Sequence, residues 1–173
     1  MLGALPRSSR DVNKTLPTPP AARTIRYHWE DFEVGKVREF GHCEVTREAV
    51  LEFASRYDPQ PFHLDDSAAA ASMFGKLAAS GWHTTAMMMR MLVENKSAIQ
   101  QAGLGSPGLD ELRWLKPVYP GDVLRVETEV LDKRPSRSRA DMGSFRTLAT
   151  IYNQDNVAVM TVISIGLIRR RPE

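Results

Sequence analysis

The stretch GWHTTAMMMRMLVENKSAIQQ, residues 81–101, contains the longest helical pattern in this chain. Its first half is apolar around most of the helix circumference, which predicts burial on several sides rather than along one stripe. The positions that carry this pattern are Ala86, Met87, Met88, Met89, Met91, Leu92 and Val93. We therefore expect a long helix from Trp82 to about Gln101 that lies inside the domain.

The segments after this helix follow a different period. Beyond Gly108, apolar and polar residues alternate, which is typical of half-buried β-strands. Four strands are predicted there, one around 112–114 and others at 124–130, 144–152 and 157–168. Turn sequences lie between strands at Pro117–Asp122 and Asn153–Asn156. We expect these four strands to form an antiparallel meander.

Shorter elements precede the long helix. We predict a strand over 37–45, a helix over 47–57 that Thr46 caps, and a short helix over 67–71 that Asp65 or Asp66 caps. A single buried helix together with an antiparallel sheet predicts an α+β domain, with the sheet wrapped around the long central helix.

We expect this single domain to cover residues 27–168, between a flexible tail at 1–26 and a basic tail at 169–173. A chain of 173 residues is an ordinary length for one domain. Because such a small sheet cannot close on itself, its edges and open face favour a partner subunit.

The composition excludes several classes of function. The formal net charge is +2 and no basic stripe is interleaved with aromatic residues, so nucleic-acid binding is not indicated. No stretch approaches the ~20 apolar residues that cross a bilayer. The single cysteine, Cys43, excludes an internal disulfide framework and a multi-cysteine metal site. We expect a cytoplasmic protein.

The segment Asp58-Pro59-Gln60-Pro61-Phe62-His63 carries the chemical signal. Its two prolines predict a rigid, non-helical loop just after the helix over 47–57. A carboxylate and an imidazole held close together can share a water molecule and act as an acid–base pair. From these two residues alone a structural role is also open, with Asp58 ending a helix and His63 bonded to the backbone.

A second apparent motif does not fit its context. Residues 103–108, GLGSPG, match the dinucleotide-binding pattern of spaced glycines, but they follow a helix, contain Pro107 and lead into a strand. We interpret them as a turn.

Taken in order, these motifs resemble the MaoC-like acyl dehydratases, a family of the hotdog fold that includes (R)-specific enoyl-coenzyme A hydratases. The resemblance covers residues 27–168. Four features carry it: the segment from Asp58 to His63, its His63-Leu64-Asp65 continuation, Phe74-Gly75 with Ser80-Gly81 before the long helix, and Pro117–Asp122.

The chain departs from the family pattern at three places. Gln60 stands where the family usually has Asn, and it offers the same amide groups on a longer stem. Ser80 stands where His is frequent, and His83 could partly substitute for that imidazole. Met89 occupies the region in which some members carry a serine.

The resemblance implies a hydratase or dehydratase of acyl thioesters, with Asp58, His63 and Gly81 as catalytic groups. Asp58 and His63 would hold and deprotonate one water, and the Gly81 N–H would stabilise the enolate oxygen. The implied substrate-binding residues are Gln60, Ser80, Trp82, His83 and Trp114. Trp82, Met88 and Trp114 could line an acyl tunnel or could simply pack in the core.

The resemblance also implies partners. The substrate would be an acyl-coenzyme A or an acyl-carrier thioester, the assembly a homodimer or larger homo-oligomer, and neither a metal nor a redox cofactor is implied. The expected metabolic setting is that of fatty acids.

Two other functions stay open at this stage. One is a hotdog thioesterase, which generally has an acidic residue on the long helix; Glu94 is the only acid there. The other is a non-catalytic acyl-thioester-binding subunit, which would have no need of both Asp58 and His63.

Overall fold

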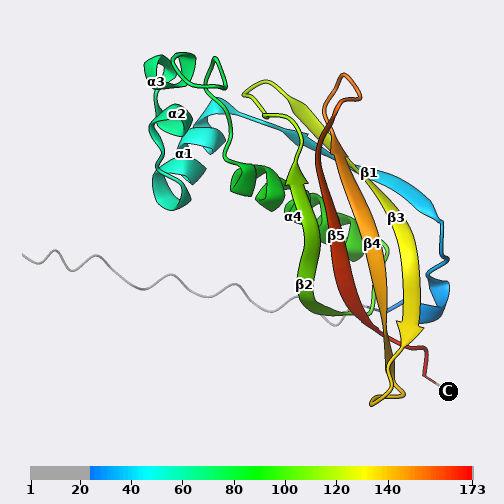
Figure 1. Ribbon diagram of the computed structural model, residues 1–173. Coiled ribbons are helices and arrows are strands. Elements are labelled where there is room, and N and C mark those ends of the chain that lie inside the picture. The colour runs from blue at the N-terminus through cyan, green and yellow to red at the C-terminus, as the bar shows by residue number, and fades with distance from the viewer. Residues whose placement is uncertain (1–23, 173) are drawn as a thin grey trace, which may run out of the picture.

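A computed structural model of the chain describes residues 24–172. Its main feature is one curved, five-stranded antiparallel sheet that wraps around the helix α4 (Gly81–Ala98) (Figure 1). The strand order is β1 (Val37–Glu44), β3 (Val123–Pro135), β4 (Met142–Tyr152), β5 (Ala158–Arg169) and β2 (Gly103–Trp114). This arrangement confirms the predicted α+β hotdog architecture.

The core lies between α4 and the inner face of the sheet. Met88 and Met91 are 0% and 1% exposed, and they pack in one cluster with alternate residues of the strands. Those strand residues are Leu124, Val126, Ala149, Ile151, Met160 and Val162. Since successive strand residues face opposite sides of a sheet, this alternation directs one face of each strand toward α4.

Helix α4 is less enclosed than its sequence predicts. Trp82, Met89 and Val93, which lie along one side of the helix, are each more than 40% exposed. The sheet covers the opposite side of α4 only, so this apolar stripe remains on the surface of the single chain.

The short helices begin at the residues that the sequence indicated. Helix α1 spans Arg47–Tyr57, and the Thr46 hydroxyl accepts a hydrogen bond from the Ala49 N–H at 3.2 Å. Helix α3 spans Asp66–Ala70, and the Asp65 carboxylate accepts one from the Ala68 N–H at 2.8 Å. A short 3-10 turn, η1, covers Trp29–Asp31.

The segment from Asp58 to His63 was wrongly predicted to be entirely non-helical. Residues Pro61–Leu64 form the single-turn helix α2, with Gln60 at its N-cap position. Proline is favoured at the first position of a helix, because its fixed φ suits the helix and its missing N–H has no partner there in any case. Pro61 therefore starts a helix rather than preventing one.

The interpretation of residues 103–108 as a turn was also wrong, since they form the first half of β2. This strand pairs with β5 from Gly103 opposite Ile168 to Trp114 opposite Met160, with several register shifts. Because β2 lies at the edge of the sheet, Pro107 and the irregular glycines can be accommodated.

The pairing of β2 with β5 also shows that the predicted meander of four consecutive strands is wrong. Only β3, β4 and β5 are consecutive neighbours, whereas β2 lies beside β5 at the far edge. The segment around Pro117–Asp122 therefore does not join neighbouring strands but leads from the β2 edge to β3, next to β1.

The two predicted tails differ in how much of each the structure describes. The predicted tail at 1–26 lies almost wholly outside the described residues. At the other end, Arg170 and Arg171 form ion pairs with Glu30 and Asp31 at 3.1 and 2.7 Å, so the basic segment is bound to the domain surface. In the described part of the chain, no helix combines the length and the apolar character that crossing a membrane requires.

Replacing Met88 by alanine should lower the free energy of unfolding by about 2–5 kcal/mol, because the side chain is fully buried and its removal leaves a cavity. Met73→Ala is the matched control: Met73 is 93% exposed, so its truncation should change stability by less than about 0.5 kcal/mol. Urea denaturation at one fixed protein concentration compares them. Equal effects of the two substitutions would contradict the assignment of Met88 to the core.

Candidate active site

Asp58 and His63 meet where α1 ends and α2 begins. Asp58 terminates α1, with its N–H bonded to the Ala54 carbonyl at 3.0 Å, and His63 lies in the single turn of α2. The Asp58 Oδ2 and His63 Nε2 atoms are 3.6 Å apart, with side-chain exposures of 18% and 6%. The structure thus brings the two predicted residues together, in a position that is shielded but still open to solvent.

The backbone fixes the orientation of the His63 ring. Its Nδ1 lies 2.7 Å from the Ala78 carbonyl oxygen, which can only accept a hydrogen bond. Nδ1 is therefore assigned as the protonated nitrogen, and Nε2 of the neutral ring is an acceptor that faces the Asp58 carboxylate. Two acceptors cannot bond to each other directly, but both can bind the hydrogens of one water molecule.

Two donors hold the Asp58 carboxylate. The Ser80 hydroxyl donates to Oδ2 at 2.6 Å, and the Gln60 amide donates to Oδ1 at 2.7 Å. Partial burial raises the pKa of Asp58, but the hydrogen bonds from Ser80 and Gln60, together with the attraction of His63 when its ring is protonated, outweigh burial, so the net pKa lies below the ordinary value. Asp58 is therefore ionised at neutral pH.

Ser80 also connects this pair to the start of α4. Its hydroxyl accepts a hydrogen bond from the Trp82 N–H at 3.2 Å, and its carbonyl accepts one from the Thr84 N–H at 3.1 Å. The first N–H groups of a helix have no partner within the helix and carry partial positive charge. Within residues 24–172, the Gly81 N–H has no hydrogen-bond acceptor, so it is free to bind a ligand oxygen.

The two tryptophans lie beside Gly81 rather than in the core. A Cβ atom on Gly81 would be 2.6 Å from Cε2 of Trp114, so only glycine fits against this ring. Trp82 packs edge-to-face on Trp114 at 5.3 Å, and the two side chains are 57% and 45% exposed. Of the two alternatives for these tryptophans, simple packing in the core is therefore excluded. Met88, by contrast, belongs to the core cluster.

His83 does not join this arrangement. Its ring stacks on Phe53 of α1 at 4.8 Å with an interplanar angle of 7°, and burial lowers its pKa. The structure therefore gives His83 a packing contact between α1 and α4, and the Ser80 hydroxyl takes the place beside Asp58 that we considered for an imidazole.

Two features of the site had no clear signal in the sequence. One is the Ala78 carbonyl, which selects the His63 tautomer through a backbone atom that any residue would supply. The other is the aromatic support of the imidazole by Phe62 and Phe74, whose ring centroids lie 4.7 and 5.8 Å from it. Within residues 24–172, no three His, Cys, Asp or Glu side chains are grouped as metal ligands.

A family model described as a MaoC like domain matches residues 31–150. The chain belongs to the MaoC-like dehydratase family. The crystal structure of a MaoC-like dehydratase from Rhodospirillum rubrum is 42% identical in sequence, with a TM-score of 0.79, covering 86% of this chain and 100% of its own.

Two curated relatives complete the comparison. An uncharacterised protein, YdeM of Bacillus subtilis, is 31% identical over 82% of this chain and 98% of its own length. A 3-hydroxybutyryl-CoA dehydratase of Methylorubrum extorquens is 32% identical over 65% of this chain and 69% of its own length. The family thus includes enzymes that add water to, or remove it from, coenzyme A thioesters.

Replacing Ser80 by alanine should lower the free energy of unfolding by about 2 kcal/mol, because it removes both a helix cap and a charge-assisted hydrogen bond. It should also raise the pKa of Asp58. NMR titration of the Asp58 carboxyl and urea denaturation measure the two effects. Ser55→Ala is the control, since Ser55 is exposed and bonds only to a carbonyl of its own helix.

The sign of the pH dependence follows from the lowered pKa of folded Asp58. Its ionisation stabilises the folded state above the ordinary carboxyl pKa, and this contribution is lost as the pH falls through the lower, folded-state pKa. In Ser80→Ala the folded-state pKa of Asp58 should lie closer to the ordinary carboxyl value. The free energy of unfolding of this variant should therefore change less over the same acidic range than that of the wild type. An unchanged pKa of Asp58 in the variant would contradict this role of Ser80.

Proposed function

We propose that this protein is an acyl-thioester hydratase/dehydratase, which catalyses reversible addition of water to a trans-2-enoyl thioester. The observation that carries the proposal is the pair of acceptors, Asp58 Oδ2 and His63 Nε2, which lie 3.6 Å apart and are tied through Ser80 to the free N–H of Gly81. A dehydratase of 3-hydroxybutyryl-CoA among the relatives supports the same chemistry.

In the proposed reaction, one water binds between Asp58 and His63. His63 Nε2 takes a proton from this water while its oxygen bonds to Cβ of the substrate, and Asp58 holds the second hydrogen. The π electrons of the C=C bond form a double bond between Cα and the carbonyl carbon, and the π electrons of the C=O bond move to the thioester oxygen, which gives the enolate. The proton on Nε2 then returns to Cα on the same face. Acid–base assistance of this kind contributes about 10²–10⁴-fold to a rate.

The Gly81 N–H would stabilise the enolate oxygen. It stands at the positive end of α4, and the absence of a side chain on Gly81 makes room for the Trp114 ring beside this backbone. Loss of one such donor typically lowers a rate about 10²–10³-fold. Water addition changes no net oxidation state, so the proposed reaction uses only these groups and the thioester, and no redox cofactor.

The thioesterase alternative is disfavoured by the position of Glu94. This residue lies 13 positions after Gly81, about 20 Å along the helix, and pairs with Arg90 at 2.9 Å in solvent. A non-catalytic acyl-thioester-binding subunit would have no need of a carboxylate and an imidazole held 3.6 Å apart, as Asp58 and His63 are.

We also propose that the assembly is a homodimer and that the thioester is carried by coenzyme A or by an acyl carrier protein. The exposed side of α4, with Trp82 and Met89, lies next to the exposed edge strand β2, with Leu109 and Trp114. An apolar surface beside an unpaired strand edge is suited to a second copy of the chain.

Crotonyl-coenzyme A and longer trans-2-enoyl thioesters should be hydrated by the wild-type protein, with (R)-3-hydroxyacyl products. Asp58→Asn and His63→Ala should each reduce kcat/KM by at least about 10²-fold, because each removes one of the two groups that hold the water. Loss of absorbance of the conjugated thioester and chiral analysis of the product give the measurement.

Two matched variants control this experiment. His42→Ala removes a 72%-exposed imidazole, and Glu94→Gln removes the acid of the helix; both should retain full activity. A parallel free-thiol assay detects hydrolysis. Thiol release that depends on Glu94, without hydration, would replace the proposed function by a thioesterase.

A further inference from the structure

The cavity with the most distinctive lining lies away from Asp58 and His63. It is about 110 Å³ in volume and lies between the second half of α4, strands β1 and β2 and the inner face of the sheet. Its lining residues on α4 run from Met88 to Lys96, which lie 7 and 15 positions after Gly81, or about 10 and 22 Å along the helix. None of the catalytic groups proposed above lines this cavity.

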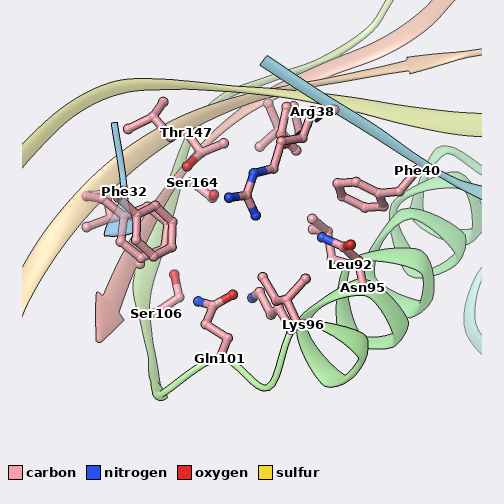
Figure 2. Close-up of a pocket in the computed structure, with 18 of the residues that line it drawn as sticks. Phe32, Arg38, Phe40, Leu92, Asn95, Lys96, Gln101, Ser106, Thr147 and Ser164 are labelled. Carbon is pink, nitrogen blue, oxygen red and sulfur yellow. Dashed lines mark hydrogen bonds between the residues drawn. The ribbon is translucent and has the colours of Figure 1, made fainter. Parts of the chain in front are cut away.

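Two cations face this cavity. Figure 2 shows the Arg38 guanidinium directed into its centre and the Lys96 side chain directed toward it from the end of α4. Within residues 24–172, no carboxylate lies within 4 Å of either charged group. Glu33, the acid in the lining, is paired with Lys36 at 2.7 Å, so Arg38 and Lys96 give the cavity excess positive charge.

The contacts of these cations leave capacity for a ligand. Arg38 donates to the Tyr27 hydroxyl and lies over its ring at 4.5 Å, which uses only part of its five N–H donors. Lys96 has no carboxylate partner in the described part of the chain, and desolvation by burial lowers its pKa. An anion between these two groups would compensate for their charge.

A buried hydroxyl points to the same conclusion independently. Thr147 of β4 is only 9% exposed, and its Oγ1 is buried without a hydrogen-bond partner in the described part of the chain. In Figure 2 this hydroxyl faces the same space as the Arg38 guanidinium. Since buried polar groups are nearly always paired, this hydroxyl is available to donate to an acceptor atom that enters the cavity.

The remaining walls are mainly apolar, with Asn95, Gln101, Ser106 and Ser164 as polar groups among them. Aromatic and aliphatic side chains form the walls: Phe32, Phe40, Leu92, Val130, Phe145 and Val162. The cavity also opens onto a neighbouring depression of about 310 Å³ with which it shares Lys96, Gln101 and Phe145. The space therefore suits a molecule with an anionic head and an apolar chain.

We propose that this cavity binds the carboxylate end of an apolar chain, with Arg38, Lys96 and Thr147 as the groups that recognise the carboxylate. The same chemistry is offered by a free fatty acid and by a substrate acyl chain that ends in a second carboxylate. Binding of a free fatty acid here does not depend on the proposed hydratase activity, because Asp58 and His63 do not line the cavity, whereas the dicarboxylic acyl chain rests on the proposed function.

The test is binding of octanoate to the full chain, measured by isothermal titration calorimetry. We expect saturable binding with one octanoate per chain. Octan-1-ol, which lacks the charge, and acetate, which lacks the chain, should bind at least about tenfold more weakly. Arg38→Met and Lys96→Met should each weaken octanoate binding about tenfold or more. Arg90→Met, which removes an exposed charge elsewhere on α4, should not change it.

Thr147→Val separates a binding role from a packing defect. It keeps the shape of the side chain and removes the unpaired hydroxyl, so it should raise the Tm of the ligand-free protein and also weaken octanoate binding several-fold. A raised Tm with unchanged octanoate affinity would overturn the role of Thr147. The proposal as a whole fails if octanoate does not bind, or if it binds equally to Arg38→Met, Lys96→Met and wild type.

The source of the carboxylate is distinguished by competition. If octanoate is displaced by hexadecanedioyl-CoA but not by palmitoyl-CoA, the site takes the far end of a dicarboxylic acyl chain. If octanoate binds equally well in the presence of both, the site takes a free acid. Either outcome supports the carboxylate site, whereas equal displacement by both thioesters would show that the chain alone is recognised and would overturn it.

Discussion

The hydroxyl of Ser80 is the contact on which the site depends. It is 1% exposed, it donates to Asp58 at 2.6 Å and it accepts from the Trp82 N–H at 3.2 Å. One side chain thus fixes the carboxylate in position and at the same time caps the helix whose first N–H is proposed to bind the enolate. Because α4 is held by the sheet through Met88 and Met91, the orientation of Asp58 is linked to the packing of the core.

The sequence predicted those elements whose local signals agree with the final packing. Helix α1 has a capping residue, Thr46, and an apolar face, and it was predicted with the observed bounds. The sequence was less informative for the elements whose structure is decided by pairing between distant segments. Strand β2 contains Pro107 and three glycines, which favour a turn locally, but hydrogen bonds to β5 hold it in the sheet. Strand order is likewise set by long-range pairing, which a local pattern does not encode.

The site could be predicted in part for the same reason. Asp58 and His63 are close in sequence, so their encounter needed only a tight connection, which Pro61 supplies by starting α2. The sequence shows Ser80 where histidine is frequent in the family. It does not show the hydrogen bond from Ser80 to Asp58, because that bond joins residues 22 positions apart. His83 was considered a substitute for that histidine, and its stacking on Phe53 could be recognised only in three dimensions.

The central claim is that one water, held between Asp58 and His63, supplies both the hydroxyl group and the proton on one face of the substrate. Hydration of crotonyl-coenzyme A in deuterium oxide tests it most directly, with the position of deuterium at Cα determined by NMR. A single deuterium on the same face as the new hydroxyl is expected. Deuterium on the opposite face, or an equal mixture at the earliest times of the reaction, would contradict it.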